Sequence, residues 1–128
     1  MSPSRYEDLR DISIQGLAHV GDAVFELMVR TWLCTTGTST ARKLHDRAVT
    51  FVSAKAQAVA VDKVLSLLDE EELGVYKRGR NTHVNSVPKG STHEEYHAAT
   101  GFEALFGYLY LAGRTDRLNV LFDVIVGR

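Results

Sequence analysis

The chain has 128 residues, a formal net charge of −1 and 45% hydrophobic residues, a balance that fits one folded domain and excludes a general polyanion-binding chain. Its single cysteine excludes an intramolecular disulfide and a cysteine-rich zinc site, and a reducing cytoplasm is the expected compartment. No apolar run is long enough to cross a bilayer, and the first residues lack the apolar core of a signal peptide, so we expect no membrane partner.

The apolar periodicity is helical almost throughout, with two prolines and no strand-like alternation, which predicts an all-α single domain over residues 1–128. The expected helices span about 12–34, 41–51, 54–68, 70–80, a fifth that follows Ser91 or Thr92 and reaches Ala112, and a last one that follows the Thr115 cap and runs through Val126. The residues expected to cap them are Ser39 or Thr40, Ser53, Asp69, Ser91 or Thr92 with Glu94 and Glu95 behind, and Thr115. Residues 81–90 form the longest non-periodic segment and are expected to be a loop.

Two expected helices each carry a carboxylate within an apolar run, Asp22 in the first and Glu103 in the fifth. Burying a charge costs several kcal/mol unless it is paired or bound to a metal, and oxygen ligands suit Mg²⁺ or Mn²⁺. Glycines 21, 101 and 107 weaken these helices, and a close crossing near Gly21 and Gly107 would explain them and bring the two acids together. The alternative is that each carboxylate only accepts structural hydrogen bonds.

A third acid, Glu26, lies one turn beyond Asp22, and an ion pair with Arg30 is its expected role rather than metal ligation.

Charge is unevenly distributed along the chain, because residues 73–93 contain no Asp or Glu. That stretch holds Lys77, Arg78, Arg80 and Lys89, and phosphate contact is favoured over a merely solvated turn. No aromatic residues interleave with these cations to stack unpaired bases, which favours a duplex ligand. A weaker basic cluster lies at Arg42, Lys43 and Arg47.

Several motifs together resemble the ribonuclease III family, and most closely its Mini-III subfamily of proteins made of the catalytic domain alone. They are Gly21-Asp22-Ala23-Val24 followed by Glu26-Leu27, Arg78-Gly79-Arg80-Asn81, Tyr96 to Ala104, and Phe102 to Leu111. The sequence departs from full-length ribonuclease III at Gln15, Ala18 and Thr100, where that family carries further acids. Asp22 and Glu103 are what remains of the usual acidic cluster, as in Mini-III proteins.

The resemblance implies a Mg²⁺-dependent endoribonuclease, with Mn²⁺ able to substitute, that cleaves double-stranded RNA to 5′-phosphate and 3′-hydroxyl ends. Asp22 and Glu103 would hold the metal; Lys77, Arg78, Arg80 and Lys89 would contact RNA phosphates, and Asn81 a 2′-hydroxyl. It also implies a homodimer, maturation of the 23S ribosomal RNA precursor, and no double-stranded-RNA-binding domain. Phe25, Met28 and Trp32 are the candidates for the dimer surface.

Two other functions stay open at this point. One is a non-catalytic module with the ribonuclease III fold that binds ribosomal RNA. The other is a helical protein-interaction domain whose acids are incidental.

Overall fold

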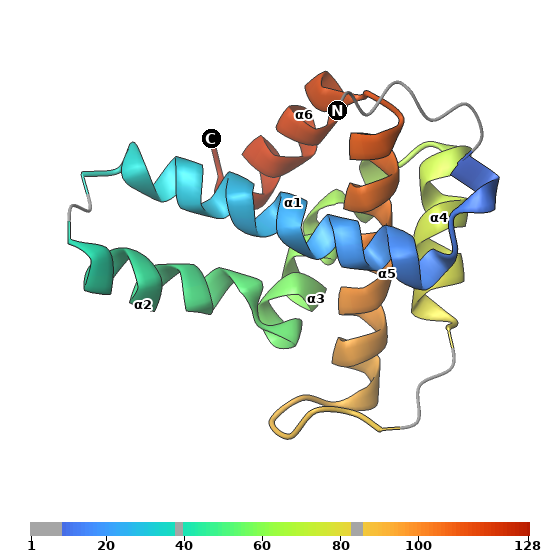
Figure 1. Ribbon diagram of the computed structural model, residues 1–128, viewed down its shortest axis with the longest axis horizontal. Coiled ribbons are helices and arrows are strands. Elements are labelled where there is room, and N and C mark those ends of the chain that lie inside the picture. Colours follow the sequence, from blue (N-terminus) through green and yellow to red (C-terminus); the bar gives the residue numbers. More distant parts are fainter. Residues whose placement is uncertain (1–8, 38–39, 83–85) are drawn as a thin grey trace.

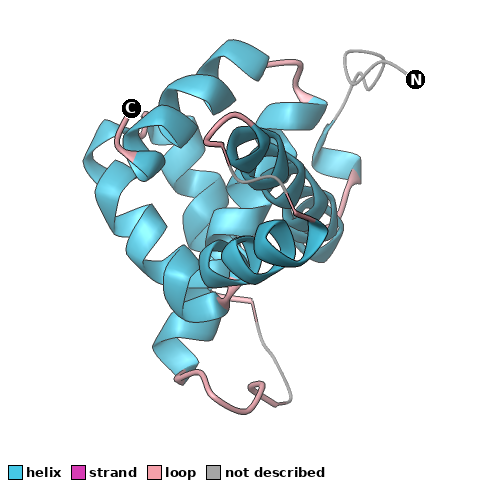
Figure 2. Ribbon diagram, turned by 90° about the vertical axis from the view of Figure 1, so that its left-hand side faces the viewer, coloured by secondary structure: helices cyan, strands magenta, loops and turns pink. Residues whose placement is uncertain are grey.

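The computed structural model describes residues 9–37, 40–82 and 86–128 (Figure 1). These residues form helices and loops without a strand, so the all-α prediction is confirmed (Figure 2). The elements are η2 (Leu9–Asp11), α1 (Ile14–Cys34), α2 (Ala41–Val52), α3 (Ala54–Val64), η3 (Leu65–Leu67), α4 (Glu70–Arg80), α5 (His93–Leu111) and α6 (Thr115–Val126).

The helix starts follow local side-chain chemistry. Asp69 and Thr92 each complete a capping box, with Glu72 and Glu95 respectively, and Thr40 caps α2 through the backbone N–H of Lys43. Ser39, the alternative cap for α2, lies outside the described residues.

Three expected boundaries were wrong. The first helix begins at Ile14 rather than Ile12, because the Ser13 side chain accepts a hydrogen bond from the backbone N–H of Gly16. The third helix ends at Val64, where the backbone tightens into η3. The last helix has Arg114, not Thr115, at its N-cap, and no side chain caps it.

Helix α5 is the centre of the domain and packs against α1, α3, α4 and α6. Figure 1 shows α1 crossing in front of α5, with α2 running back beneath α1. The core at this crossing is aromatic: the ring of Phe25 meets those of Phe102 and Phe106 edge-on, at centroid distances of 4.9 and 5.6 Å.

This core uses two of the residues expected at a dimer surface. Phe25 is fully buried, and Trp32 packs edge-on against Phe51 and Phe122. The expectation that Phe25 faces a partner is therefore wrong, because rings of α5 and α6 already cover it. For the half-buried Trp32 the expectation stays a prediction. Met28 is half-buried against the same core.

Two glycine pairs set how closely the helices approach. A Cβ on Gly21 would overlap the carbonyl oxygen of Glu103, and one on Gly107 would overlap that of Leu17, so α1 and α5 touch backbone to backbone. A Cβ on Gly79 of α4 would lie 2.8 Å from the Cα of Gly101. The prediction that glycines 21, 101 and 107 serve close helix approach is confirmed.

A buried ion pair joins α4 to α6. Glu72 is completely buried, and the guanidinium of Arg117 donates to both its carboxylate oxygens at 2.8 and 2.9 Å. Burial alone would raise the pKa of Glu72, but the hydrogen bonds from Arg117 and from the backbone of Asp69 outweigh it and hold that pKa below its ordinary value.

None of the helices in the described ranges combines enough length with enough apolar character to span a membrane.

Candidate active site

The crossing of α1 and α5 brings Asp22 and Glu103 together. Gly21 directly precedes Asp22, and its Cα faces the backbone of Glu103, so the two acids meet beside the glycine contact. Burial, a hydrogen bond with Asp22 and the negative charge of Asp22 together raise the pKa of Glu103 to about 8, although Gln57 acts in the opposite direction. The predicted meeting of the two carboxylates is confirmed.

The surroundings of the two acids differ from the buried pair that the sequence suggests. Asp22 is exposed, whereas Glu103 is half-buried. Because Gly21 rather than Asp22 occupies the helix contact, the Asp22 side chain is left at the edge of the crossing, where solvent and ligands reach it. The pair therefore forms the rim of an open site.

Gln57 of α3 is a buried hydrogen-bond partner of Glu103. Its side chain is 2% exposed, and its Nε2 donates a hydrogen bond to Oε2 of Glu103 over 3.5 Å. A primary amide can donate to one carboxylate oxygen and leaves the other available. This hydrogen bond restrains the Glu103 carboxylate, which lines the cleft described next.

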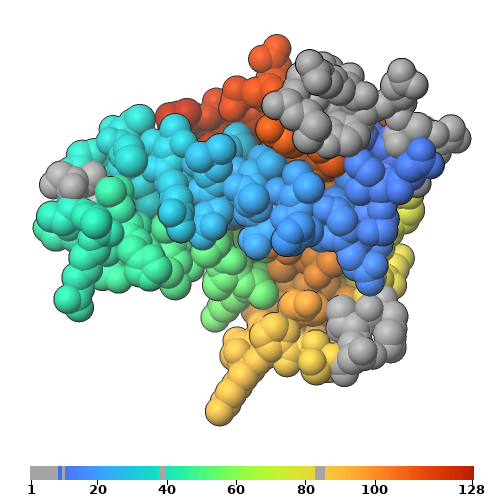
Figure 3. Space-filling model, viewed as in Figure 1, coloured from blue at the N-terminus to red at the C-terminus, as the bar shows by residue number. Residues whose placement is uncertain are grey.

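A cleft of about 300 Å³ opens beside Glu103, between the start of α3, the 88–91 segment and the first half of α5. The polar side chains that line it belong to Ser53, Lys55, Gln57, Lys89, Ser91, Tyr96, Thr100 and Glu103. In Figure 3 the 86–92 segment projects beyond the body of the molecule, next to the green start of α3. Cationic and carboxylate groups thus share one concave surface.

The predicted RNA-contacting residues are divided between two places. Lys89 lines the cleft beside Glu103. Lys77, Arg78 and Arg80 belong to the last turn of α4, and Asn81 is its C-cap.

None of these α4 residues lines the cleft. The Arg80 guanidinium carbon lies 5.6 Å from the ring centroid of Tyr76, and its Nε is 3.4 Å from Oδ1 of Asn81. Arg78 lines a different hollow, which it shares with Glu70 and Glu71. Gly79 is not a flexible point between two arginines, because it is packed against Gly101.

Glu26 and Thr100, which lie near the carboxylate pair in the sequence, have partners of their own. Glu26 forms an ion pair with Arg30 at 3.4 Å, as expected. Thr100 donates its hydroxyl to the carbonyl oxygen of Tyr96 over 3.0 Å. Within the described ranges, no third His, Cys, Asp or Glu joins Asp22 and Glu103 in a three-ligand cluster.

Residues 15–114, which include both acids and the α4 cations, match the ribonuclease III domain. The chain belongs to the ribonuclease III family. The Mini-ribonuclease 3 of Thermoanaerobacter sp. (strain X514) is 43% identical over 120 residues, covering 94% of this chain and 84% of that protein. The Mini-ribonuclease 3 of Clostridium tetani is 38% identical over 121 residues, covering 94% and 80% respectively.

A solved structure agrees with this assignment. A Fusobacterium nucleatum protein superposes with a TM-score of 0.86 and 31% identity, covering 94% of this chain and 93% of that one. The relatives identify the Mini-III group within the ribonuclease III family, and membership makes this domain an endoribonuclease.

Two polar residues of this ribonuclease III site were not predicted from the sequence. Gln57 and Lys55 lie in an Ala- and Val-rich helix whose sequence pattern is typical of core packing. Only the packing of α3 on α5 brings the two residues to Glu103. For Gln57, the one available signal was a glutamine among small apolar residues, on the helix face expected to be buried.

Proposed function

We propose that this endoribonuclease is Mg²⁺-dependent and cleaves double-stranded RNA, with Asp22 and Glu103 as the metal-holding residues. The observation that carries the proposal is the meeting of these two carboxylates beside a cleft that Glu103 lines together with Lys55 and Lys89. Carboxylates alone would repel an RNA backbone, and lysines alone would not support hydrolysis. Their combination suits a polyanionic substrate that reacts next to a cation.

The donor set fits a hard divalent cation. Asp22 and Glu103 offer only oxygen ligands, and Mg²⁺ typically uses one or two carboxylates while keeping several waters. Burial and Asp22 raise the pKa of Glu103 to about 8, which shows that a negative charge on this carboxyl is unfavourable without a cation. A bound Mg²⁺ would compensate that charge, lower the pKa of a water and stabilise the oxygen that leaves phosphorus.

The chain's own residues supply orientation around that centre. Gln57 donates to one oxygen of Glu103 and leaves the other oxygen without this hydrogen bond. The glycine crossing sets the separation of the two helices and therefore of the two acids. Exposure of Asp22 leaves the site open to a duplex rather than to a small molecule alone.

We also propose that RNA phosphates bind the cations at the end of α4 and in the 86–92 segment. Lys77, Arg78, Arg80 and Lys89 are all exposed, and Asn81 beside them can donate to or accept from a 2′-hydroxyl. Arg78→Ala and Arg80→Ala are expected to weaken binding to many duplex sequences alike.

The 23S ribosomal RNA precursor is our proposed substrate and the cytoplasm our proposed compartment. The high similarity to proteins named Mini-ribonuclease 3 and the single cysteine support these two proposals. A homodimer, with one site per subunit for each strand, is the proposed assembly. An apolar hollow of about 540 Å³ between α1 and the end of α5 and start of α6 supports it, with Leu27 65% exposed at its edge.

The test replaces each acid by its amide. Asp22→Asn and Glu103→Gln are expected to abolish cleavage of a long RNA duplex in Mg²⁺ while leaving the circular dichroism spectrum unchanged. Glu26→Gln is the matched control, because Glu26 lies one turn from Asp22 but pairs with Arg30. Wild-type cleavage by either amide variant at saturating Mg²⁺ would remove that residue from the metal site.

The same assay separates the competing function. A non-catalytic module that binds ribosomal RNA would retain the duplex in Mg²⁺ without cutting it, and both amide variants would behave like the wild type.

A further inference from the structure

Lys55 is the second residue of α3, and its side chain lines the same cleft as Glu103. We propose that Lys55 contacts a backbone phosphate of the bound duplex beside the carboxylate pair. The inference rests on the proposed function, and it adds a residue of α3 to the RNA surface. The chemical group recognised is a phosphodiester of duplex RNA close to the reacting one.

The side chain of Lys55 is available for such a contact. Within the described ranges, no hydrogen bond or ion pair engages its ammonium group, and the residue is exposed. Many other cations are already engaged, since Arg30, Arg117 and Arg128 each pair with a carboxylate. A free ammonium group in a concave surface is a suitable partner for a phosphate oxygen.

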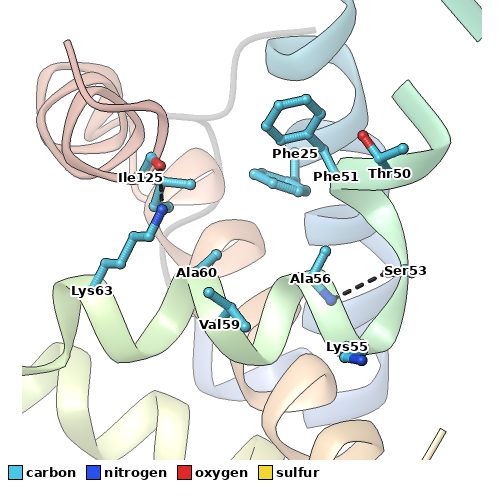
Figure 4. Close-up of a pocket in the computed structure, with 10 residues that line it drawn as sticks. All are labelled: Phe25, Thr50, Phe51, Ser53, Lys55, Ala56, Val59, Ala60, Lys63 and Ile125. Atoms are coloured by element: carbon cyan, nitrogen blue, oxygen red, sulfur yellow. Dashed lines mark hydrogen bonds between the residues drawn. The ribbon is translucent and has the colours of Figure 1, made fainter. Parts of the chain in front are cut away.

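Lys63 of the same helix is a lysine whose ammonium group already has a hydrogen-bond partner. Its Nζ donates to the carbonyl oxygen of Ile125 over 3.1 Å (Figure 4). Lys55 lies two turns earlier, at the start of α3 next to Ser53. Both lysines line the hollow drawn in Figure 4, but only Lys55 also lines the cleft beside Glu103.

The charges around the cleft favour a cation at the position of Lys55. Asp22 is an exposed acid beside Glu103, and a carboxylate at close range opposes the approach of a polyanion. A cation in the same cleft offsets this repulsion where the backbone must approach most closely. The α4 cations cannot supply that effect equally well, because they do not line this cleft.

The experiment measures duplex RNA affinity at several salt concentrations, in Ca²⁺ to prevent turnover, for the wild type, Lys55→Ala, Lys55→Arg and Lys63→Ala. Lys55→Ala is expected to flatten the slope of log affinity against log salt by about one unit, since one phosphate contact is lost. Lys55→Arg should restore the slope, and Lys63→Ala should leave it unchanged. Thermal melting of Lys55→Ala should match that of the wild type.

Two results overturn the inference while the proposed function stands. They are a wild-type slope in Lys55→Ala, or an equal loss in Lys63→Ala, either one in a protein that still cleaves duplex RNA in Mg²⁺. If the wild-type protein neither binds nor cleaves a duplex, the proposed function fails and Lys55 has no phosphate to contact.

Discussion

Gly21 of α1 and Gly107 of α5 face each other at the helix crossing, so that the space for a Cβ on either residue is already filled by backbone of the other helix. The atoms in the way are carbonyl groups of Glu103 and Leu17, which cannot rotate aside as a flexible side chain can. The same contact that packs the two helices therefore also sets the spacing of Asp22 and Glu103.

Gly21→Ala and Gly107→Ala are each expected to lower the free energy of unfolding by about 3 kcal/mol or more, because the two backbones must separate. Chemical denaturation measures the change. Gly74→Ala is the matched control: Gly74 is a helical glycine with no atom near its Cβ position, so alanine should stabilise by roughly 0.5–1 kcal/mol. Equal stability of all three variants would mean that the helices do not touch at the glycines.

The metal-free protein is expected to lose stability as pH rises. Burial and Asp22 hold the pKa of Glu103 at about 8, whereas the unfolded chain releases that proton near 4.5. Folding thus takes up a proton between these values, so the stabilisation is complete below about pH 4.5 and is lost as pH approaches 8.

Unfolding free energies of the wild type and Glu103→Gln, measured across this range in chelator, isolate the effect. The amide variant cannot ionise at this position, so the difference between the two curves should change with pH. Parallel curves would contradict the raised pKa.

Gln57→Leu is expected to weaken metal binding by about tenfold, as loss of a hydrogen bond to a metal ligand commonly does. The leucine keeps the volume but cannot donate to Oε2 of Glu103. Mn²⁺ binding followed by electron paramagnetic resonance measures this without RNA. Val61→Ala, a buried change one turn further along α3, controls for lost core stability and should retain wild-type Mn²⁺ affinity.

Arg117→Met is expected to destabilise the fold by about 3 kcal/mol, since it leaves the fully buried Glu72 without its closest partner. Arg114, at 3.9 Å from the same carboxylate, retains part of the interaction. Arg128→Met, which removes an exposed pair with Asp123, should change stability by less than about 1 kcal/mol. Similar losses in both variants would argue against a special role for the buried pair.

Leu27→Glu is expected to convert a dimer into a monomer, because it places a charge at the edge of the apolar hollow. Light scattering should give about twice 14.2 kDa for the wild type and about 14.2 kDa for the variant. Val49→Glu alters another exposed apolar residue, on α2, and should remain dimeric. A wild-type monomer that still cuts both strands would refute the assembly.

Local sequence chemistry determined most of the helices. Apolar periodicity and the caps at Asp69 and Thr92 depend only on residues within a turn or two, so they can be read without the fold. Glycines 21 and 107 also carried enough information to predict a close crossing, because glycine inside an apolar helix needs a packing reason. The acids Asp22 and Glu103 were identified from their places within apolar helical runs and from the family motifs, and the crossing predicted that they meet.

Tertiary packing alone decided what surrounds those acids. Exposure of Asp22, burial of Gln57 behind Glu103 and the presence of Lys55 in the cleft depend on how α3 and α5 pack, which residue spacing within one helix cannot reveal. The role of Phe25 was misread for the same reason, since an apolar helix face looks alike whether α6 or another subunit covers it. Periodicity reports which face of a helix is apolar, and only the arrangement of the other helices determines what that face meets.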